Sequence, residues 1–517
     1  MRKYLYITVF FSGMTCLAIE MSAERLLGNV FGTSNLVWAS IIGLILIYLA
    51  AGYFLGGYLA DRKPSPRWFF LILLLAAISI ALIPPISKPV LRMASEAFDQ
   101  LAFGILIGSF IAVLILLFVP MILLGTASPF AIRLAVDETT KVGSISGKIY
   151  AISTLGSFIG TFLPGLILIP LIGTYRTILA FSFLLLIVSL VGLWISSGNK
   201  AMLRLLWTPP LVIAIGLWGI AGPYKVTKNK IFETESAYNY IQVLEEDGYR
   251  MLRLNDGQGV HSMYHPTVLN YYGPWEQVLV APFFNRAPYQ LSNVKSLAII
   301  GLAAGTTARQ ATAVYGDIRI DGYEIDPEIV QVGRRYFDMT QPNLNVLVQD
   351  GRWGIAHSQE KYHIISIDAY RPPYIPWHLT TREFFTIVHQ HLTPDGVMVI
   401  NVGRSPTDRR LINALGSTIL SVFPTIHVID IPNTFNSIIF ATLQPTETKN
   451  LIENYHWMSK DASISPLLIE TMQVTIANLQ PVPQQEKVFT DDWAPVEWIT
   501  NTMILDFVFS GNVEDLQ

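Results

Sequence analysis

Two patterns of hydrophobic and polar residues divide the chain near residue 222. Before that point, long apolar runs follow one another with only short polar connections between them. A helix needs roughly 20 mostly apolar residues to cross a bilayer. Runs of that length lie at about 4–26, 37–60, 68–87, 103–125, 146–170, 174–195 and 205–222. The pattern therefore predicts a multi-span α-helical membrane domain of about seven helices over residues 1–222.

Lysine and arginine are shared unevenly between the connections. If every run crosses, one face carries Arg2, Lys3, Arg62, Lys63, Arg67, Arg133, Lys141, Lys200 and Arg204. The other face carries mainly Lys88, Arg92 and Arg176. Basic residues favour the cytoplasmic side, so the N-terminus is expected there and the C-terminal half outside. We expect a multi-pass protein of the cell (inner) membrane, with the lipid bilayer as a partner.

Charged residues also occur within the first apolar run. Glu20 and Glu24 are one helical turn apart, and Arg25 follows directly. Acids inside a membrane are costly and often mark a transport or ligand site. The alternative is structural, with Glu24 and Arg25 at the interface and Glu20 paired to a neighbouring helix. The sequence leaves both readings open.

From Ile231 the apolar residues recur at every second position, which is typical of strands. Tyr238–Leu244, a turn at Asp247-Gly248 and Met251–Leu254 predict a β-hairpin that leads to Tyr264. We assign residues 223–270 to this small region on the substrate side. In residues 271–517 short apolar strands alternate with helices, which predicts an α/β Rossmann-like domain with a mostly parallel sheet.

A glycine-rich turn joins the first strand of that domain to a helix. Leu297–Ile300 is the strand, Gly301 and Gly305 frame the turn, and the helix is expected from about Thr307. Such a turn leaves free N–H groups and the positive end of a helix facing a ligand. The turn therefore predicts that a ligand binds at this edge of the sheet.

Acids end the next three predicted strands. They are Glu324, Asp350, which is followed by Gly351, and Asp368. Ligands of such sheets bind outside the carboxyl ends of the strands, where a carboxylate can accept hydrogen bonds from ribose hydroxyls. We expect the three acids to line one nucleoside-binding crevice.

Two later segments lie close to this crevice. The proline-rich stretch 371–377 follows Asp368 directly and is either a lid or a rigid connector. The acidic and aromatic stretch 490–497 either returns to the crevice or caps the surface. The sequence does not choose between these alternatives.

Composition narrows the class of partner. The chain has 517 residues, is 51% hydrophobic and 14% charged, and has a net charge of −3, so nothing favours a nucleic-acid partner. Its single cysteine, Cys16, excludes a disulfide within one chain. No spacing of histidines predicts a metal site.

Together these residues resemble the spermidine synthase (polyamine aminopropyltransferase) family in its membrane-fused form. The resembling motifs of the membrane half are Phe31-Gly32-Thr33-Ser34, Trp38, Gly52-Tyr53, Gly56-Gly57, Leu59-Ala60-Asp61-Arg62, Leu124-Gly125-Thr126 and Thr154-Leu155-Gly156. Those of the other half are the hairpin, Tyr264-His265, Gly301–Gly305, Glu324-Ile325-Asp326, Asp350-Gly351, Asp368 and the stretch 490–497.

The resemblance implies that the Rossmann-like domain is of the S-adenosylmethionine methyltransferase type. It implies aminopropyl transfer from decarboxylated S-adenosylmethionine to a small amine such as putrescine. The donor is then a co-substrate rather than a permanently bound cofactor. It implies Asp368 as the catalytic carboxylate with Tyr264 beside the amine. The implied donor-binding residues are Gly301, Gly305, Glu324 on the ribose, Asp350 at the adenine, and Gly351. The implied substrate-binding residues are Asn239, His265 and Arg371. A homo-oligomer is left open.

Three departures from the family pattern keep alternatives in view. Ala304 and Arg371 stand where soluble members have acids, and Pro266 stands where a glutamate usually follows the Tyr-His pair. The first alternative is an S-adenosylmethionine-dependent methyltransferase. The second is a non-catalytic ligand-sensing or transport-associated membrane protein, which fits the outside location that the charges predict. An aminopropyltransferase instead needs a donor that is made in the cytoplasm.

Overall fold

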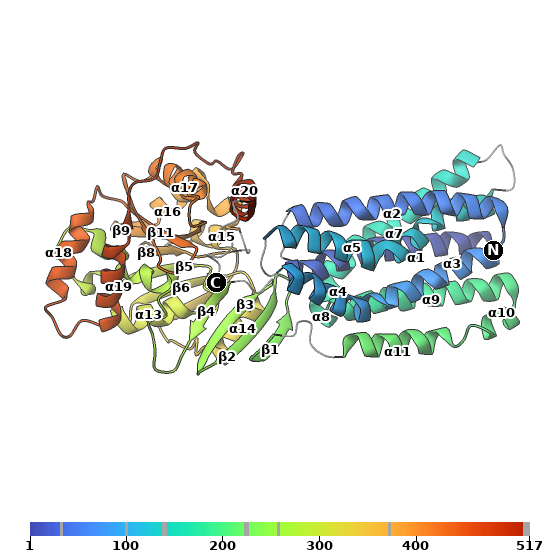
Figure 1. Ribbon diagram of the computed structural model, residues 1–517, viewed down its shortest axis with the longest axis horizontal. Helices are drawn as coiled ribbons and strands as arrows, with labels where there is room; N and C mark the ends of the chain where they lie inside the picture. Colours follow the sequence, from blue (N-terminus) through green and yellow to red (C-terminus); the bar gives the residue numbers. More distant parts are fainter. Residues whose placement is uncertain are drawn as a thin grey trace. The chain divides into compact units, whose positions relative to one another are not determined.

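The computed structural model describes residues 1–31, 35–98, 102–136, 142–221, 227–255, 259–370 and 374–509. The chain forms two compact units (Figure 1). The N-terminal unit comprises Met1–Thr227 together with Glu235–Ala237. The C-terminal unit comprises Lys228–Thr234 and Tyr238–Gln517.

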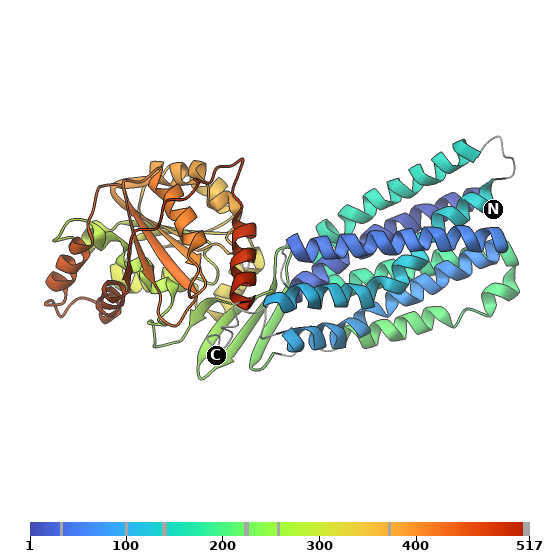
Figure 2. The same cartoon turned by 45° about the horizontal axis from the view of Figure 1, so that its top comes forward.

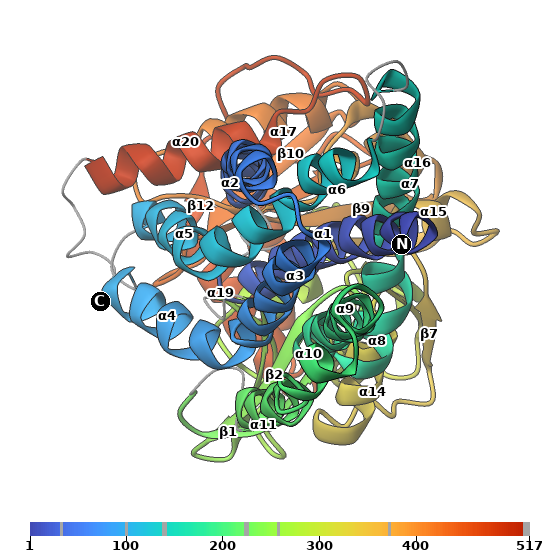
Figure 3. The ribbon, with the colours of Figure 1, turned by 90° about the vertical axis from the view of Figure 1, so that its right-hand side faces the viewer.

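The N-terminal unit is a bundle of helices, several of which Figure 3 shows nearly along their axes. The helices are α1 (Arg2–Phe31), α2 (Asn35–Arg62), α3 (Pro66–Ala81), α4 (Ile83–Phe98), α5 (Ala102–Gly125), α6 (Ala127–Ala135), α7 (Val142–Leu163), the π-helical η2 (Pro164–Leu168), α8 (Ile169–Ile172), α9 (Thr174–Ser197), α10 (Asn199–Leu203) and α11 (Thr208–Ile220).

Six helical stretches of the described residues are long and apolar enough to cross a membrane. A seventh is added if α3 and the first part of α4, which meet at a bend of 43°, count as one span. Pro84 and Pro85 lie just after the break. Prolines lack the N–H that a continuous helix needs, which accounts for a bend at this point.

Contacts between helix ends show that the chain runs back and forth through this unit. At one end Arg2 donates to the carbonyl of Ala135 at 2.8 Å, and Arg133 pairs with Asp61 at 3.0 Å. At the other end Lys88 donates to the carbonyl of Ala221. Counting the bent pair as one crossing, the described helices pass between the two ends seven times.

Glycines let α1 and α7 approach closely. A Cβ atom on Gly156 would lie 2.0 Å from the carbonyl oxygen of Phe10, and one on Gly160 would lie 2.1 Å from that of Met14. Gly52 of α2 contacts α5 in the same way, near Ile122. Small residues at such positions allow the backbone contact on which helix association in membranes depends.

A buried ion pair closes one end of the N-terminal unit. Arg25 lies 3.4 Å from Glu235, and their side chains are 15% and 4% exposed. Asn29 donates to the same carboxylate at 3.0 Å, as does the backbone N–H of Thr174 at the start of α9. An anion is favourable at a helix N-terminus, so the carboxylate is held by a cation, an amide and a helix end. Arg25 thus has a structural role.

Replacing Arg25 by methionine is expected to destabilise the N-terminal unit. The Glu235 carboxylate would stay buried without its cation, which costs roughly 3–5 kcal/mol. The apparent melting temperature of the full chain in detergent should therefore fall by several degrees. Arg133→Met is the matched control, because the Arg133–Asp61 pair is exposed and such pairs contribute about 0–1 kcal/mol. Equal melting temperatures for the two variants would contradict this role.

The C-terminal unit opens with an antiparallel sheet of four strands in the order β1-β2-β3-β4. They are β1 (Lys230–Glu235), β2 (Tyr240–Glu246), β3 (Tyr249–Leu254) and β4 (Val260–Tyr264). The predicted hairpin corresponds to β2 and β3, which pair antiparallel around Asp247 and Gly248. Both turn residues have positive φ, 50° and 83°.

A second sheet of eight strands forms the centre of this unit, in the order β12-β10-β11-β9-β8-β5-β6-β7. The strands are β5 (Ser296–Ile300), β6 (Arg319–Glu324), β7 (Leu344–Val348), β8 (Tyr362–Ile367), β9 (Leu392–Gly403), β10 (Thr425–Asp430), β11 (Asn436–Thr442) and β12 (Leu479–Gln480). From β9 to β7 neighbouring strands are parallel, whereas β11 pairs antiparallel with β9 and with β10. The predicted Rossmann-like class is confirmed.

Helices cover both faces of the sheet, as Figures 1 and 2 show. They are α12 (Pro274–Gln277), η3 (Val278–Phe284), η4 (Leu291–Asn293), α13 (Thr306–Tyr315), α14 (Pro327–Tyr336), α15 (Gly351–Ala356), η5 (Trp377–Leu379), α16 (Arg382–Gln390), α17 (Arg410–Leu420), α18 (Thr448–Met458), α19 (Pro466–Ala477) and α20 (Val496–Phe509). Alternate strand residues face opposite cores. Leu297 and Ile299 pack in the core with α13, α18 and α19, and Ala298 and Ile300 pack in the core with α15, α16 and α17.

Candidate functional site

The turn between β5 and α13 is built by two glycines in the left-handed region. Gly301 has φ 86° and Gly305 has φ 87°. A Cβ on Gly301 would lie 2.5 Å from the carbonyl oxygen of Asp368, so the end of β8 lies directly against the turn. Only glycine tolerates both this φ and this approach.

The amides of this turn are occupied, contrary to the expectation of free N–H groups. Gly301 and Leu302 donate to the carbonyl of Tyr323, and Gly305 donates to that of Leu302. Ala303 and Ala304 donate to side chains, namely the Glu324 carboxylate and the Ser262 hydroxyl, both at 2.9 Å. Glu324 and Ser262 come from other segments of the chain, so no local pattern reports these two hydrogen bonds. The turn is preformed and offers close backbone approach.

Glu324 ends β6 and reaches back to the turn. Its carboxylate accepts the N–H of Ala303 at 2.9 Å and that of Asp326 at 3.0 Å. The residue is 7% exposed. Burial raises the pKa of Glu324 to about 7, although the hydrogen bonds from the amides of Asp326 and Ala303 oppose the rise. The predicted ribose carboxylate therefore lies beside the glycine turn.

Asn239 lies close to the same strand end. Its amide donates to the carboxylate of Asp326 at 2.9 Å and accepts from the amide of Asn255 at 3.0 Å. Asp326 in turn caps α14 by accepting the N–H of Glu328. Asn239 thus connects the four-stranded sheet to the end of β6, and its contact with a substrate stays a prediction.

Asp368 follows β8 and is held by β9. One carboxylate oxygen accepts the amide of Asn401 at 2.9 Å. Within the described residues, its second oxygen has no hydrogen-bond partner. Burial raises the pKa of Asp368, and the Asn401 hydrogen bond opposes this rise. A carboxylate with a raised pKa and one oxygen left over is suited to accept a proton from a ligand.

Tyr264 is brought to the start of α13 by β4. The backbone of Met263 exchanges two hydrogen bonds with the hydroxyl of Thr306, each 2.9 Å long. The guanidinium of Arg309 lies 4.5 Å from the centre of the Tyr264 ring. The same guanidinium donates to the carbonyl of His265 at 2.9 Å. Tyr264 therefore lies beside the helix that the glycine turn begins.

His265 makes the contacts of a turn residue. Its Nδ1 accepts the N–H groups of Thr267 and Val268 at 3.2 and 3.1 Å, and its ring lies 4.6 Å from that of Tyr249. The two hydrogen bonds occupy Nδ1, and the contact with Tyr249 covers one face of the imidazole ring. Its predicted contact with the substrate stays a prediction.

Asp350 begins α15 at the end of β7. One of its oxygens caps the helix by accepting the N–H of Trp353 at 2.8 Å, and the other lies 3.2 Å from Nε2 of His378. The His378 hydrogen bond is the main cause that lowers the pKa of Asp350. A Cβ on Gly351 would lie 2.4 Å from Cγ2 of Ile300, so α15 begins directly against β5.

The predicted lid is described only in part. Arg371, Pro372 and Pro373 lie outside the described residues, so the predicted substrate contact of Arg371 stays a prediction. Further along the loop Ile375 is buried and Tyr374 donates to the side chain of Asn501 at 2.6 Å. A lid role for this loop stays a prediction as well.

The strand ends bring the predicted residues to one edge of the sheet. Ile300 is in register with Tyr323 and with Ile367, and Glu324 is in register with Val348. Two further residues contact this set and were not predicted. Asn401 could have been found, because it directly follows the apolar run 397–400 just as Asp368 follows its own run. His378 has no local signal, because its contact depends on how the loop folds.

Carboxylates at the ends of parallel strands, over a glycine turn and with helices on both faces of the sheet, define a nucleoside-binding α/β domain. A family model described as "Spermine/spermidine synthase domain" matches residues 284–454. This part of the chain is therefore similar to the spermine/spermidine synthase domain, the family that its motifs resemble.

Relatives of known description agree. A Bifidobacterium longum (strain NCC 2705) protein described as "Probable polyamine aminopropyl transferase" is 32% identical over 293 residues, which are 52% of this chain and 62% of that protein. The polyamine aminopropyltransferase of Vibrio vulnificus (strain CMCP6) is 27% identical over 308 residues, which are 55% of this chain and 97% of that protein. The chain thus spans less than two thirds of the first relative.

Solved structures give a weaker likeness. A crystal structure described as a probable spermidine synthase from Corynebacterium glutamicum ATCC 13032 has a TM-score of 0.39 and 20% identity, and covers 54% of this chain and 94% of its own. Human methyltransferase-like protein 13 has a TM-score of 0.33 and 22% identity, and covers 43% of this chain and 97% of its own.

Affinity for an adenosine-type ligand is expected to rise with pH through the pKa of Glu324, which is about 7. In the predicted contact, ribose hydroxyls donate to the ionised carboxylate, so binding should favour loss of the proton and affinity should level off above that pKa. Between pH 6 and 8 the gain should be about tenfold. Calorimetry with methylthioadenosine, which has no group titrating in this range, measures it. A Glu324→Gln variant should lack this slope, and a slope as steep as that of the wild type would contradict the assignment.

Proposed function

We propose that the chain is a membrane-anchored aminopropyltransferase that moves an aminopropyl group from decarboxylated S-adenosylmethionine to a small amine such as putrescine. The observation that carries the proposal is the position of Asp368 beside the glycine turn, with one carboxylate oxygen left over among the described contacts. The matched family and its relatives support the same reaction class.

The proposed reaction needs a base and correct placement. The amine nitrogen attacks the carbon beside the donor's sulfonium, so a C–N bond forms as the C–S bond breaks, and methylthioadenosine leaves. A protonated amine has no lone pair, so Asp368 takes one proton and later passes it to solvent. Holding the two substrates in line supplies much of the rate, because the sulfonium is already a good leaving group.

In this proposal the other residues orient the substrates. Glu324 binds the ribose hydroxyls and Asp350 the adenine, with Gly301 and Gly351 allowing close approach of the backbone. Residues 223–270 form the substrate side and supply Tyr264 next to the amine. The acceptor amine is cationic before it reacts, and the carboxylate of Asp368 favours it.

Ala304 limits how the donor is held. It is 1% exposed and packs in an apolar cluster with Ile241, Leu252 and Val332. An ammonium group placed in that cluster would lose its hydration without gaining an anion. The donor's ammonium group therefore needs a partner other than residue 304 in this chain.

Asp368→Asn is expected to lower turnover about 10²- to 10⁴-fold, because the amide cannot take the proton. The dissociation constant of methylthioadenosine should stay within about twofold, since the variant keeps its shape and its Asn401 contact. The assay follows methylthioadenosine release from decarboxylated S-adenosylmethionine and putrescine by the full chain in detergent. Asp461→Asn, an exposed aspartate that bonds Ser463, is the matched control. Turnover within tenfold of wild type would refute the role of Asp368.

A ligand-sensing or transport-associated role is the second candidate, and one observation favours it. The end of the N-terminal unit that holds Arg2, Arg133 and Ala135 also carries most of the basic residues of the connections. The last helix, α11, ends at the opposite end, where Lys88 contacts Ala221. With the basic face in the cytoplasm, an odd number of crossings leaves the C-terminal unit outside, away from a donor made inside the cell.

The expected topology is a cytoplasmic N-terminus and an external C-terminus. An alkaline phosphatase fused after Gln517 should be active, because that enzyme needs the oxidising exterior, and a fluorescent protein at the same position should stay dark. The same reporters fused before Met1 are the control and should give the reverse result. A fluorescent C-terminal fusion would place the C-terminal unit with the intracellular donor and would remove the support for the second candidate.

A further inference from the structure

The segment between the proline-rich loop and α16 places a histidine on the carboxylate of Asp350. Nε2 of His378 lies 3.2 Å from Oδ2 of Asp350, while Oδ1 accepts the N–H of Trp353. Each carboxylate oxygen has about two acceptor positions. The two contacts therefore fix the plane of the carboxylate and leave acceptor positions for a donor group on a ligand.

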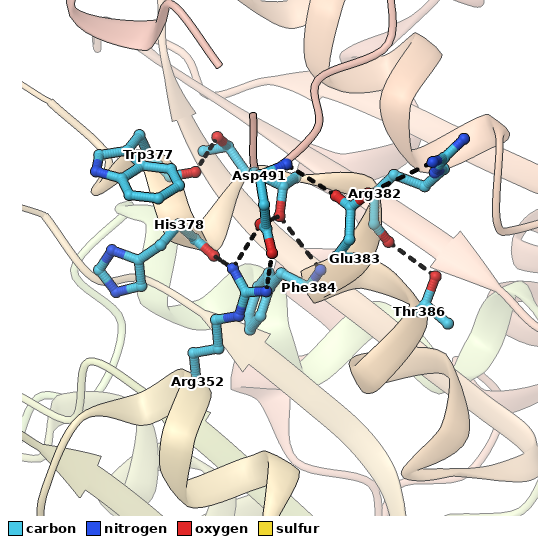
Figure 4. A network of polar contacts seen from close by, with 10 residues as sticks. Arg352, Trp377, His378, Arg382, Glu383, Phe384, Thr386 and Asp491 are labelled. Carbon is cyan, nitrogen blue, oxygen red and sulfur yellow. Dashed lines mark hydrogen bonds and ion pairs between the residues drawn. The ribbon is translucent and has the colours of Figure 1, made fainter. Parts of the chain in front are cut away.

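The C-terminal tail holds this histidine in place. Arg352, in the first turn of α15, donates to the backbone carbonyl of His378 at 2.9 Å. It also donates to both oxygens of Asp491, at 2.8 and 2.6 Å (Figure 4). Paired hydrogen bonds between guanidinium and carboxylate are the strong, directional kind. Residues 490–497 thus contact α15 through Asp491. The sequence alone allowed them either to return to the crevice or to cap the surface.

Asp491 also ties down the other end of the histidine's segment. Its carboxylate accepts the hydroxyl of Thr381 at 2.7 Å, and its N–H donates to Glu383 at 3.0 Å. The Thr381 hydroxyl in turn accepts the N–H of Phe384 and caps α16. The segment from His378 to Thr381 is therefore bracketed between α15 and α16, with Asp491 as the common partner (Figure 4).

We propose that His378 is a positioning residue of the nucleoside site and that Asp491, acting through Arg352, sets the affinity of that site for the donor. This inference rests on the proposed function, in which Asp350 accepts the adenine amino group. The charged groups that face His378 are Asp350, Asp491 and Arg352, with Glu383 beyond them. Alignment of Asp350 by His378 matters most for ligand binding and little for the reacting atoms at Asp368.

The test is calorimetry of methylthioadenosine binding to the full chain in detergent. His378→Leu should weaken binding about tenfold, the effect of losing one hydrogen bond to a charged group. His378→Gln should stay within about twofold, because its amide nitrogen can still donate to Asp350. Asp491→Asn should weaken binding about fivefold. The double variant with His378→Leu should bind no more weakly than His378→Leu alone, since Asp491 acts through His378.

Kinetics and a matched control separate positioning from general damage. With both substrates, His378→Leu should raise the KM of the donor while kcat and the KM of the amine stay within about twofold. Glu447→Gln removes an exposed carboxylate that pairs only locally with Lys449 and should change none of these values. A lower melting temperature with unchanged nucleoside affinity would show a structural role only and overturn the proposal.

The remaining outcomes are also decisive. Independent, additive losses in the double variant would overturn the role of the tail. A wild-type chain that binds methylthioadenosine but releases none from the two substrates would refute the proposed function alone, and the affinities of the variants would still decide the role of His378. A wild-type chain that binds no nucleoside would overturn both.

Discussion

The backbone contact between Gly301 and the end of β8 is the constraint on which the site depends. A Cβ on Gly301 would lie 2.5 Å from the carbonyl oxygen of Asp368 and 2.7 Å from Cα of Ala369. Any side chain here would push the proposed base away from the turn that is proposed to hold the donor. Gly351 makes a similar approach to Ile300 from the side of α15. How closely the ends of β5, β7 and β8 lie together therefore depends on Gly301 and Gly351, which have no side chain.

Local sequence patterns were enough to predict the strand ends but not their tertiary partners. Glu324, Asp350 and Asp368 each follow a short apolar run, and parallel strands must end at one edge, so both their existence and their common location could be predicted. Asn401 also follows a short apolar run, but its side chain is neutral. The hydroxyl of Ser262, which occupies the amide of Ala304, and the imidazole of His378 come from other segments, and no local pattern reports such contacts. The antiparallel direction of β11 was not predicted either, because the length of an apolar run does not encode the direction of a strand.

In the membrane half, too, the sequence predicted the elements but not their tertiary contacts. Length and apolar character located the helices, since the bilayer sets the length of a span. The role of Arg25 could not be read from its neighbours, because its partner Glu235 lies beyond the last helix of the bundle. The proline pair at Pro84 and Pro85 is visible in the sequence, but the size of the resulting bend depends on how the surrounding helices pack.

The occupied amides of the glycine turn have a consequence for which adenosine compounds the site admits. Glycine turns that bind ATP or dinucleotides do so through free N–H groups that surround a phosphate. Here the amides from Gly301 to Gly305 already have partners, and two acids, Glu324 and Asp368, lie beside the turn. A phosphorylated nucleotide would meet like charge and could not use these five amides as donors. The most abundant adenine nucleotides of a cell would thus be poor competitors for the proposed sulfonium donor.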